Sequence, residues 1–208
     1  MVIKYMKVKN SGKNKIVRRD DKFSSAQFYI QYGVDIERRR ITLDEDIDEF
    51  STGFSIRGIH KMIDEDPTGP IDIYINSYGG SVYDGLALYD TLVALEEAEV
   101  RTHALGKVMS MGLIIFLAGD KRYSSPRSTF MAHSVSGGSD GKIYEIKDDV
   151  EESKRLNAIL LQILADRTSM TLSWWRKQIE FRDRYYDAKQ AEQYGILEEG
   201  DDDDQEEH

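Results

Sequence analysis

Short apolar runs alternate along the chain with longer segments in which apolar residues recur every three or four positions. The first pattern predicts strands and the second predicts amphipathic helices. The expected strands begin at residue 40 and cover residues 71–75, 100–105 and 127–133. The expected helices cover residues 54–64, 83–98, 111–118 and 143–167, and residues 174–196 are expected to be largely helical.

Strands that alternate with helices predict an α/β protein with right-handed crossovers. Three strand ends carry glycine or a residue capable of catalytic chemistry, namely Gly79-Gly80, Ser110 and His133. In such folds, ligand sites collect where strands end and helices begin. We therefore expect these three strand ends to converge on one cleft.

Ser110 lies in a glycine-punctuated turn, residues 106–112, between an expected strand and an expected helix. At such a corner the hydroxyl projects outward and the free N–H groups of the helix lie beside it. The same N–H groups could hold the oxyanion that forms when a serine attacks a carbonyl. Serine is also a favoured helix N-cap, so this segment alone leaves both interpretations open.

A serine nucleophile needs a base, and the chain has four histidines. His60 falls in an expected helix, His103 falls in the middle of an expected strand, and His208 lies among the acidic residues at the C-terminus. His133 ends a strand just before a glycine-rich loop, which leaves its imidazole accessible. It is a candidate general base, although a packed structural histidine fits the pattern equally well.

The orienting carboxylate cannot be chosen from physical arguments, because 38 acidic residues are available. Asp183 is one candidate, flanked by Arg182 and Arg184 among aromatic residues. An ion-paired helix terminus is the alternative interpretation of this segment.

Composition predicts one globular domain: 40% of the 208 residues are hydrophobic and 32% are charged. No apolar run approaches the roughly 20 residues of a membrane span, so we expect no membrane partner. The absence of cysteine excludes disulfides, thiolate catalysis and cysteine-based zinc sites, and it is compatible with a cytoplasmic location.

Charge divides the chain into three parts. Residues 1–22 hold eight Lys and Arg, and we expect a flexible basic arm there. Residues 198–208 hold eight acids and no Lys or Arg, which predicts a disordered acidic tail. Residues 23–197 form the expected domain. Its acidic balance, within a net charge of −10, argues against nucleic acid as a partner.

Four motifs follow one another along the chain: INSYGGS at 75–81 with 85–91, GKVMSMG at 106–112, MAHSVSGG at 131–138 and RDRYYDA at 182–188 with 191–196. Ser110 precedes His133 by 23 residues, and His133 precedes Asp183 by 50. In this order the motifs resemble the blocks "INSPGG", "GQAASMG", "MIHQPLGG" and "RDRFLSA" of the Clp protease proteolytic subunit family. The resemblance covers about residues 39–196.

The resemblance implies a serine endopeptidase in which Ser110 is the nucleophile, His133 is the general base and later the acid, and Asp183 orients the histidine. The N–H groups of Gly80 and Met111 would form the oxyanion hole. A glycine allows close approach of the backbone to a ligand, and Met111 opens a helix, so the residue types agree with this role.

The resemblance further implies a crotonase-like fold with a repeated β-β-α superhelical core and a protruding handle helix at residues 143–167. Gly137 and Gly138 would pair with the substrate backbone. Two stacked heptameric rings would enclose a chamber for unfolded polypeptides. A Clp-type AAA+ unfoldase would use ATP to feed it, whereas this chain itself would need no cofactor or metal.

Several residues depart from the family pattern. Tyr78 replaces a proline, which makes the oxyanion turn less preorganised unless the tyrosine packs against something. Ser134-Val135 replaces Gln-Pro in the substrate-pairing segment. Residues 1–22 lack the apolar start of the family, and Ala94 stands where an aromatic often lines the unfoldase groove. These last two features weaken the expectation of an unfoldase.

Three other functions stay open at this stage. One is a processing protease of the same fold that works without an ATPase. Another is an inactive regulatory ring subunit, although the presence of Ser110, His133 and Asp183 together argues against it. A crotonase-type acyl-CoA enzyme shares the fold, and the ordered serine, histidine and aspartate motifs argue against that as well.

Overall fold

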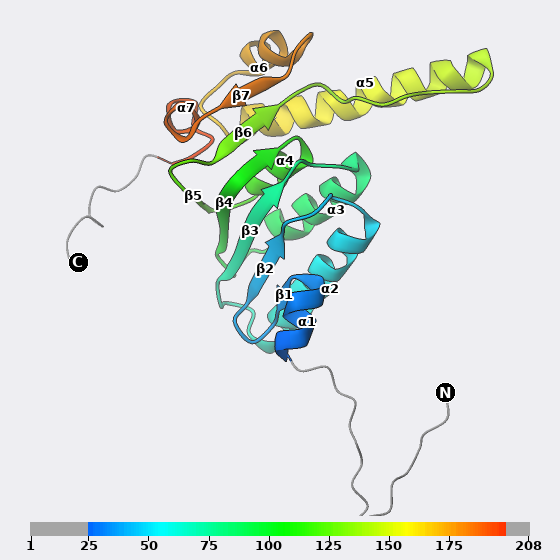
Figure 1. Ribbon diagram of the computed structural model, residues 1–208. Coiled ribbons are helices and arrows are strands. Elements are labelled where there is room, and N and C mark those ends of the chain that lie inside the picture. Colours follow the sequence, from blue (N-terminus) through cyan, green and yellow to red (C-terminus); the bar gives the residue numbers. More distant parts are fainter. Residues whose placement is uncertain (1–24, 199–208) are drawn as a thin grey trace, which may run out of the picture.

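The computed structural model describes residues 25–198, which form one seven-stranded sheet with helices packed against it (Figure 1). The strands are β1 (Val34–Asp35), β2 (Arg40–Leu43), β3 (Ile71–Ser77), β4 (Val100–Met109), β5 (Lys121–Ser124), β6 (Thr129–Ala132) and β7 (Arg184–Tyr186). The helices are α1 (Ser25–Tyr32), α2 (Glu49–Glu65), α3 (Val82–Val93), α4 (Met111–Phe116), α5 (Ile143–Asp166), α6 (Leu172–Ile179) and α7 (Ala188–Gln193).

The central strands β2, β3, β4 and β6 are parallel, and the edge strands β1 and β7 are antiparallel to their neighbours. The strand order is β1-β2-β3-β4-β6-β7. Strand β4 is long enough to serve two partners: its first half pairs with β5, and Lys107–Met109 pair with β6. This topology confirms the predicted α/β class of the crotonase-like type.

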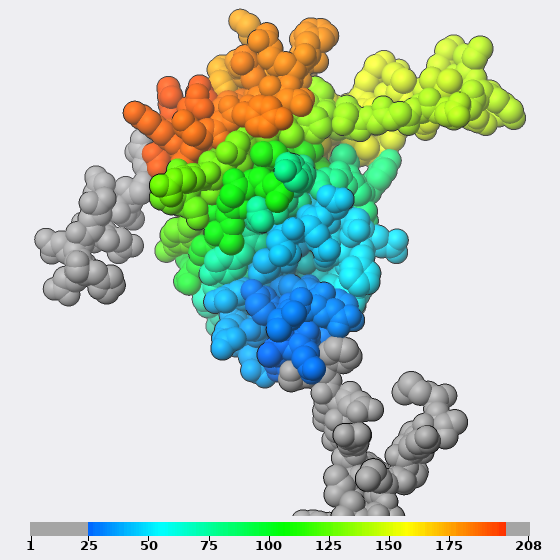
Figure 2. Space-filling model, in the orientation of Figure 1, coloured from blue at the N-terminus to red at the C-terminus, as the bar shows by residue number. Residues whose placement is uncertain are grey.

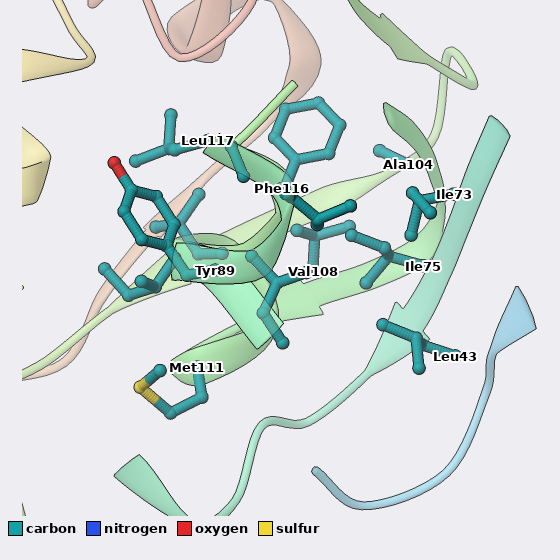
Figure 3. Packing of buried hydrophobic residues seen from close by; sticks show 14 of the residues in the cluster. Leu43, Ile73, Ile75, Tyr89, Ala104, Val108, Met111, Phe116 and Leu117 are labelled. Carbon is teal, nitrogen blue, oxygen red and sulfur yellow. The ribbon is translucent and has the colours of Figure 1, made fainter. Parts of the chain in front are cut away.

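The core lies between the sheet and the helices. In β3, buried Ile71, Ile73 and Ile75 alternate with partly exposed residues, as expected for a strand with one covered face. All residues of α4 are buried, because this short helix is enclosed by the sheet and by other helices. Figure 3 shows side chains from β3, β4 and α4 interleaved in this core.

Helix α5 protrudes from the body, as predicted for the handle (Figures 1 and 2). Its buried residues, which all lie in its C-terminal half, are Leu156, Leu160, Leu161 and Leu164. Near its start, Ile143 and Tyr144 are exposed. The segment 133–142 runs outward beside α5 to its tip (Figure 1). The protruding half of the helix thus buries little apolar surface within one chain.

The C-terminal segment 174–196 is not largely helical, and that prediction is wrong. It contains β7 between α6 and α7, and β7 pairs with β6 so that Phe130 faces Tyr186. Adjacent tyrosines favour a strand when a partner edge is available. That edge belongs to a strand more than 50 residues away, so local spacing could not reveal it.

The observed ends of two helices also differ from the predicted ones. Helix α3 ends at Val93 instead of residue 98, because the chain must turn back before β4 begins. The residue before β4, Glu99, already accepts a backbone hydrogen bond from the N–H of Ile71 at the start of β3. Helix α2 begins earlier than predicted, at Glu49, where the side chain of Asp48 caps the N–H of Ser51. The short elements α1, β1 and β5 were not predicted.

The division into a basic arm, a domain at 23–197 and an acidic tail stays a prediction. The arm at residues 1–22 and the tail from residue 199 onward lie outside the described residues. Within residues 25–198, no helix is long and apolar enough to cross a membrane.

Candidate active site

Ser110 occupies the predicted corner between β4 and α4, in a rarely used backbone conformation. Its φ of 53° lies in the left-handed region, which costs a residue other than glycine about 1–3 kcal/mol. Its N–H donates to the carbonyl of Met131 at 2.9 Å, and its own carbonyl accepts from Leu113 at 3.0 Å. The backbone on both sides is therefore held, and the strain is maintained by the surrounding sheet.

The hydroxyl of Ser110 does not cap the helix that follows it. Its Oγ lies 2.7 Å from Nε2 of His133 instead. The N-cap interpretation of this serine is therefore wrong for its side chain, although the residue does occupy the N-cap position.

His133 comes directly after β6, just as Ser110 comes directly after β4. These strands are parallel neighbours, with Met109 opposite Met131. Because their carboxyl ends meet at the same sheet edge, the two side chains emerge side by side. The predicted convergence of these strand ends is thus present in the structure.

Asp183 lies beside His133 but less closely. Its Oδ1 is 3.8 Å from Nδ1 of His133, which is within ion-pairing range but too long for a hydrogen bond. The Asp183 side chain is 54% exposed, so solvent screens this contact. The residue precedes β7, where Arg184 faces Ala132, and not a helix; this excludes the alternative of a helix terminus.

The glycine turn after β3 packs directly against the serine. Gly79 has a φ of +105°, and a Cβ atom there would lie 2.6 Å from the Cβ of Ser110. A Cβ on Gly80 would lie 2.2 Å from the carbonyl oxygen of Ile47. Only glycine allows this approach, so the turn requires both glycines for a steric reason.

Two backbone N–H groups near Ser110 are suited to binding an oxyanion. Met111 is the first residue of α4, so its N–H has no acceptor within the helix. Gly80 and Ile47 form an isolated β-bridge. Its two hydrogen bonds run from the N–H of Ile47 to the carbonyl of Gly79 and from the N–H of Ser81 to the carbonyl of Ile47, so the N–H of Gly80 takes no part in the bridge. The oxyanion role of these groups stays a prediction.

A cleft of about 620 Å³ contains Ser110, His133 and Gly80. The aliphatic and methionine part of its lining consists of Ile47, Val82, Leu113, Ile114, Met131, Ala132, Val135, Leu160 and Leu164. A larger hollow, of about 1070 Å³, lies against α7 and contains none of the predicted site residues. We assign the candidate site to the smaller cleft, because it contains Ser110 and His133, the predicted nucleophile and base.

Gly137 and Gly138 do not line this cleft. They line a separate hollow of about 370 Å³ against α5, and their substrate-pairing role stays a prediction. From the same loop, Val135 and Ser136 reach the cleft instead. The N–H of Val135 is held by Oδ1 of Asn157 at 3.0 Å, a contact with α5 that the sequence did not signal.

The other histidines within the described residues lie elsewhere. His103 stacks between the rings of Tyr74 and Tyr123, at 4.4 and 5.0 Å between centroids, and its Nε2 lies 2.7 Å from Asp72. It is a packed residue of the sheet surface, as its mid-strand position suggested. Among residues 25–198, no group of three or more His, Asp or Glu side chains is arranged to hold a metal ion.

An α/β sheet that places a strained serine against a histidine in a cleft defines a hydrolase-like site. A model of the Clp protease family matches residues 24–199 of this chain. The chain belongs to the Clp protease family, and this membership supports a peptidase.

Proposed function

We propose that this protein is a serine endopeptidase that hydrolyses unfolded polypeptides through an acyl-enzyme on Ser110. The observation that carries the proposal is the 2.7 Å contact between Oγ of Ser110 and Nε2 of His133, in a cleft bordered by the Gly79-Gly80 turn. Family membership supports the same reaction class.

In the first half of the reaction, Nε2 of neutral His133 accepts the hydroxyl proton as Oγ of Ser110 attacks the peptide carbonyl. The N–H groups of Gly80 and Met111 stabilise the oxyanion. The C–N bond then breaks as the imidazolium gives its proton to the leaving amine, and an ester on Ser110 remains. In the second half, His133 deprotonates water, which attacks the ester carbonyl. The ester C–O bond then breaks as the imidazolium returns its proton to Oγ of Ser110, and the carboxylic acid product is released.

Asp183 keeps the other imidazole proton on Nδ1 and stabilises the imidazolium. At 3.8 Å it needs to approach by about 1 Å to form a hydrogen bond. Catalytic hydrogen bonds are often long in the absence of substrate and shorten in the reacting complex. The carboxylate is therefore the member of the triad whose position depends most on substrate or on assembly.

The proposal includes assembly into two stacked heptameric rings. Family members generally form stacked rings and work with Clp ATPases. In this chain, α5 exposes Ile143, Tyr144 and Val150 on its protruding half, and apolar groups exposed together in this way fit an interface between copies. A Clp-type AAA+ unfoldase would supply unfolded chains at the expense of ATP.

Intact-mass analysis after treatment with a fluorophosphonate probe tests the nucleophile. The assembled wild-type protein should gain one adduct, and Ser110→Ala should gain none. Ser136→Ala is the matched control, because Ser136 lines the same cleft and its loss should leave labelling unchanged. An assembled wild-type ring that takes no probe would overturn the proposal in favour of an inactive ring subunit.

A further inference from the structure

The residue after His133 is bonded to a helix that is distant in the sequence. Oγ of Ser134 donates to the carbonyl oxygen of Ile179 at 2.9 Å. Ile179 is the last residue of α6 and is buried. The last four carbonyls of a helix have no partner within the helix, so this carbonyl can accept a bond from elsewhere. The end of α6 is therefore tied directly to the strand end that carries His133.

The same helix end also holds the segment that carries Asp183. Nε of Arg184, the residue directly after Asp183, donates to the carbonyl oxygen of Gln178 at 3.2 Å. The final two carbonyls of α6 thus accept one bond from the residue after the histidine and one from the residue after the aspartate. The end of α6 consequently links the two sides of the proposed imidazole–carboxylate pair.

Strand pairing stops just short of this pair. In the antiparallel pairing of β6 with β7, which lie side by side in Figure 1, the final partners are Ala132 and Arg184. His133 and Asp183 occupy the next position along the two segments, beyond the paired residues. The bond from Ser134 to α6 lies one residue further on, so it can keep the two segments together where the sheet no longer does.

Asp183 lies in a short loop that has little support of its own. Residues 180–183 belong to no helix or strand, and all four are exposed, with Phe181 at 89%. Exposed side chains bury little apolar surface and therefore contribute little to holding a loop in place. The position of the Asp183 carboxylate consequently depends on the two ends of this loop, at Ile179 and Arg184.

Ser134 does not line the cleft, although His133 before it and Val135 after it both do. It can therefore influence the reaction only through other residues. Val135 is held by a different helix, because its N–H donates to Oδ1 of Asn157 in α5. The two bonds thus have separate consequences: the Asn157 bond positions part of the cleft lining, and the Ser134 bond positions the loop that carries Asp183.

We propose that Ser134 is a positioning residue that acts through the end of α6 to hold the Asp183 carboxylate beside the His133 imidazole. The inference rests on the proposed function, because it concerns the same triad. Loss of Oγ of Ser134 releases one end of the loop, and the carboxylate then spends less time close enough to stabilise the imidazolium. Since the imidazolium forms only during the reaction, kcat should fall and KM should not change.

The test measures kcat and KM separately for the assembled protein with a short fluorogenic peptide. Ser134→Ala should lower kcat about three- to tenfold and leave KM within about twofold of the wild-type value. In an Asp183→Asn background, Ser134→Ala should lower kcat by less than about twofold, because no carboxylate remains to be positioned. A general structural defect would lower kcat equally in both backgrounds. Chemical denaturation and analytical ultracentrifugation verify that each variant is folded and assembled.

Two further variants separate this effect from a loosened loop. Asn157→Ala releases Val135 from α5 and should raise KM about two- to fivefold while kcat stays close to the wild-type value. Ser139→Ala is the matched serine control. Its hydroxyl also bonds from the same loop to α5, at Asp149, and the residue lies outside the cleft. Both kcat and KM should be unchanged in this variant.

Three outcomes overturn the inference and leave the proposed function intact. They are an unchanged kcat in Ser134→Ala, a loss of kcat that is equally large in the Asp183→Asn background, and an equal loss of kcat in Asn157→Ala. Failure of the proposed function gives a different result. In that case the assembled wild-type protein hydrolyses no peptide and takes no fluorophosphonate adduct, and the inference falls with it.

Discussion

Ser110 and Asp183 belong to two regions of the molecule that are held with different strength. Ser110 follows a ten-residue central strand, its backbone is bonded on both sides, and every residue of the helix after it is buried. Asp183 precedes a three-residue edge strand and is half exposed. The comparison teaches that interior parallel strands position Ser110 and His133, the proposed nucleophile and base. The carboxylate depends on an edge that a substrate or a neighbouring subunit can adjust.

The broadest expected effect comes from disturbing the rigid region, because both activity and stability should fall. Gly79→Ala forces a Cβ atom to within 2.6 Å of the Cβ of Ser110 at a φ of +105°. We expect peptidase activity to fall at least about 100-fold, because small misplacements of reacting groups are costly, and stability to fall by about 1–3 kcal/mol. Peptide hydrolysis and chemical denaturation measure the two effects.

Gly137→Ala is the control for that variant, since a Cβ atom there meets nothing within 4 Å. It should leave the denaturation midpoint unchanged. Wild-type activity in Gly79→Ala would contradict the steric account of the turn.

The next prediction compares His133, the proposed base, with Asp183, the carboxylate beside it. His133→Ala should reduce kcat by about 10⁴-fold or more, because it removes the proton acceptor. Asp183→Asn should cost less, about 10- to 100-fold, because its contact is long and exposed. Asp140→Asn, in an exposed loop, should have no effect. Equal losses in His133→Ala and Asp183→Asn would show that the carboxylate is held as firmly as the base.

A smaller effect separates core from protruding surface. Ile75→Ala should destabilise the chain by about 2–5 kcal/mol, because Ile75 is fully buried in β3. Ile143→Ala should change the stability of a single chain by less than about 0.5 kcal/mol, because Ile143 is 76% exposed, and should weaken ring assembly. Denaturation and analytical ultracentrifugation distinguish these results. Unchanged assembly in Ile143→Ala would remove the start of α5 from the interface.

The smallest effect concerns the link between α5 and the body. Hydrogen bonds from Arg155 and then from Tyr83 lower the pKa of Glu152 to about 2. Because the folded-state pKa is lowered, this stabilisation is present above the ordinary value of 4.5 and is lost as the pH falls towards 2. The residue is on the surface, so the effect is small.

At pH 7 the melting temperature of Glu152→Gln should therefore be slightly lower than that of the wild-type protein. This difference in melting temperature should vanish near pH 2. Glu151→Gln, a neighbouring change on the same helix, serves as the comparison. A difference that grows as the pH falls would show that the pKa of Glu152 is not lowered in the folded protein.

Local pattern in the sequence was sufficient for much of the fold. It predicted the α/β class, the main strands, the long helix at residues 143–167 and the corner at Ser110. The spacing of apolar residues reflects which positions are buried, and glycine and proline mark where an element ends. It also indicated that Ser110 and His133 would meet, since both directly follow strands. These features depend on residues close to one another along the chain.

Only the tertiary structure decided the rest. The position of Asp183 beside His133, the strand β7, and the position of Val135 in the cleft in place of Gly137 depend on pairing between distant segments. The placement of Tyr78 likewise depends on Lys107 from the neighbouring strand. The register between strands is set by side chains that pack across the sheet. The spacing of apolar residues within one segment therefore does not indicate which strand it pairs with.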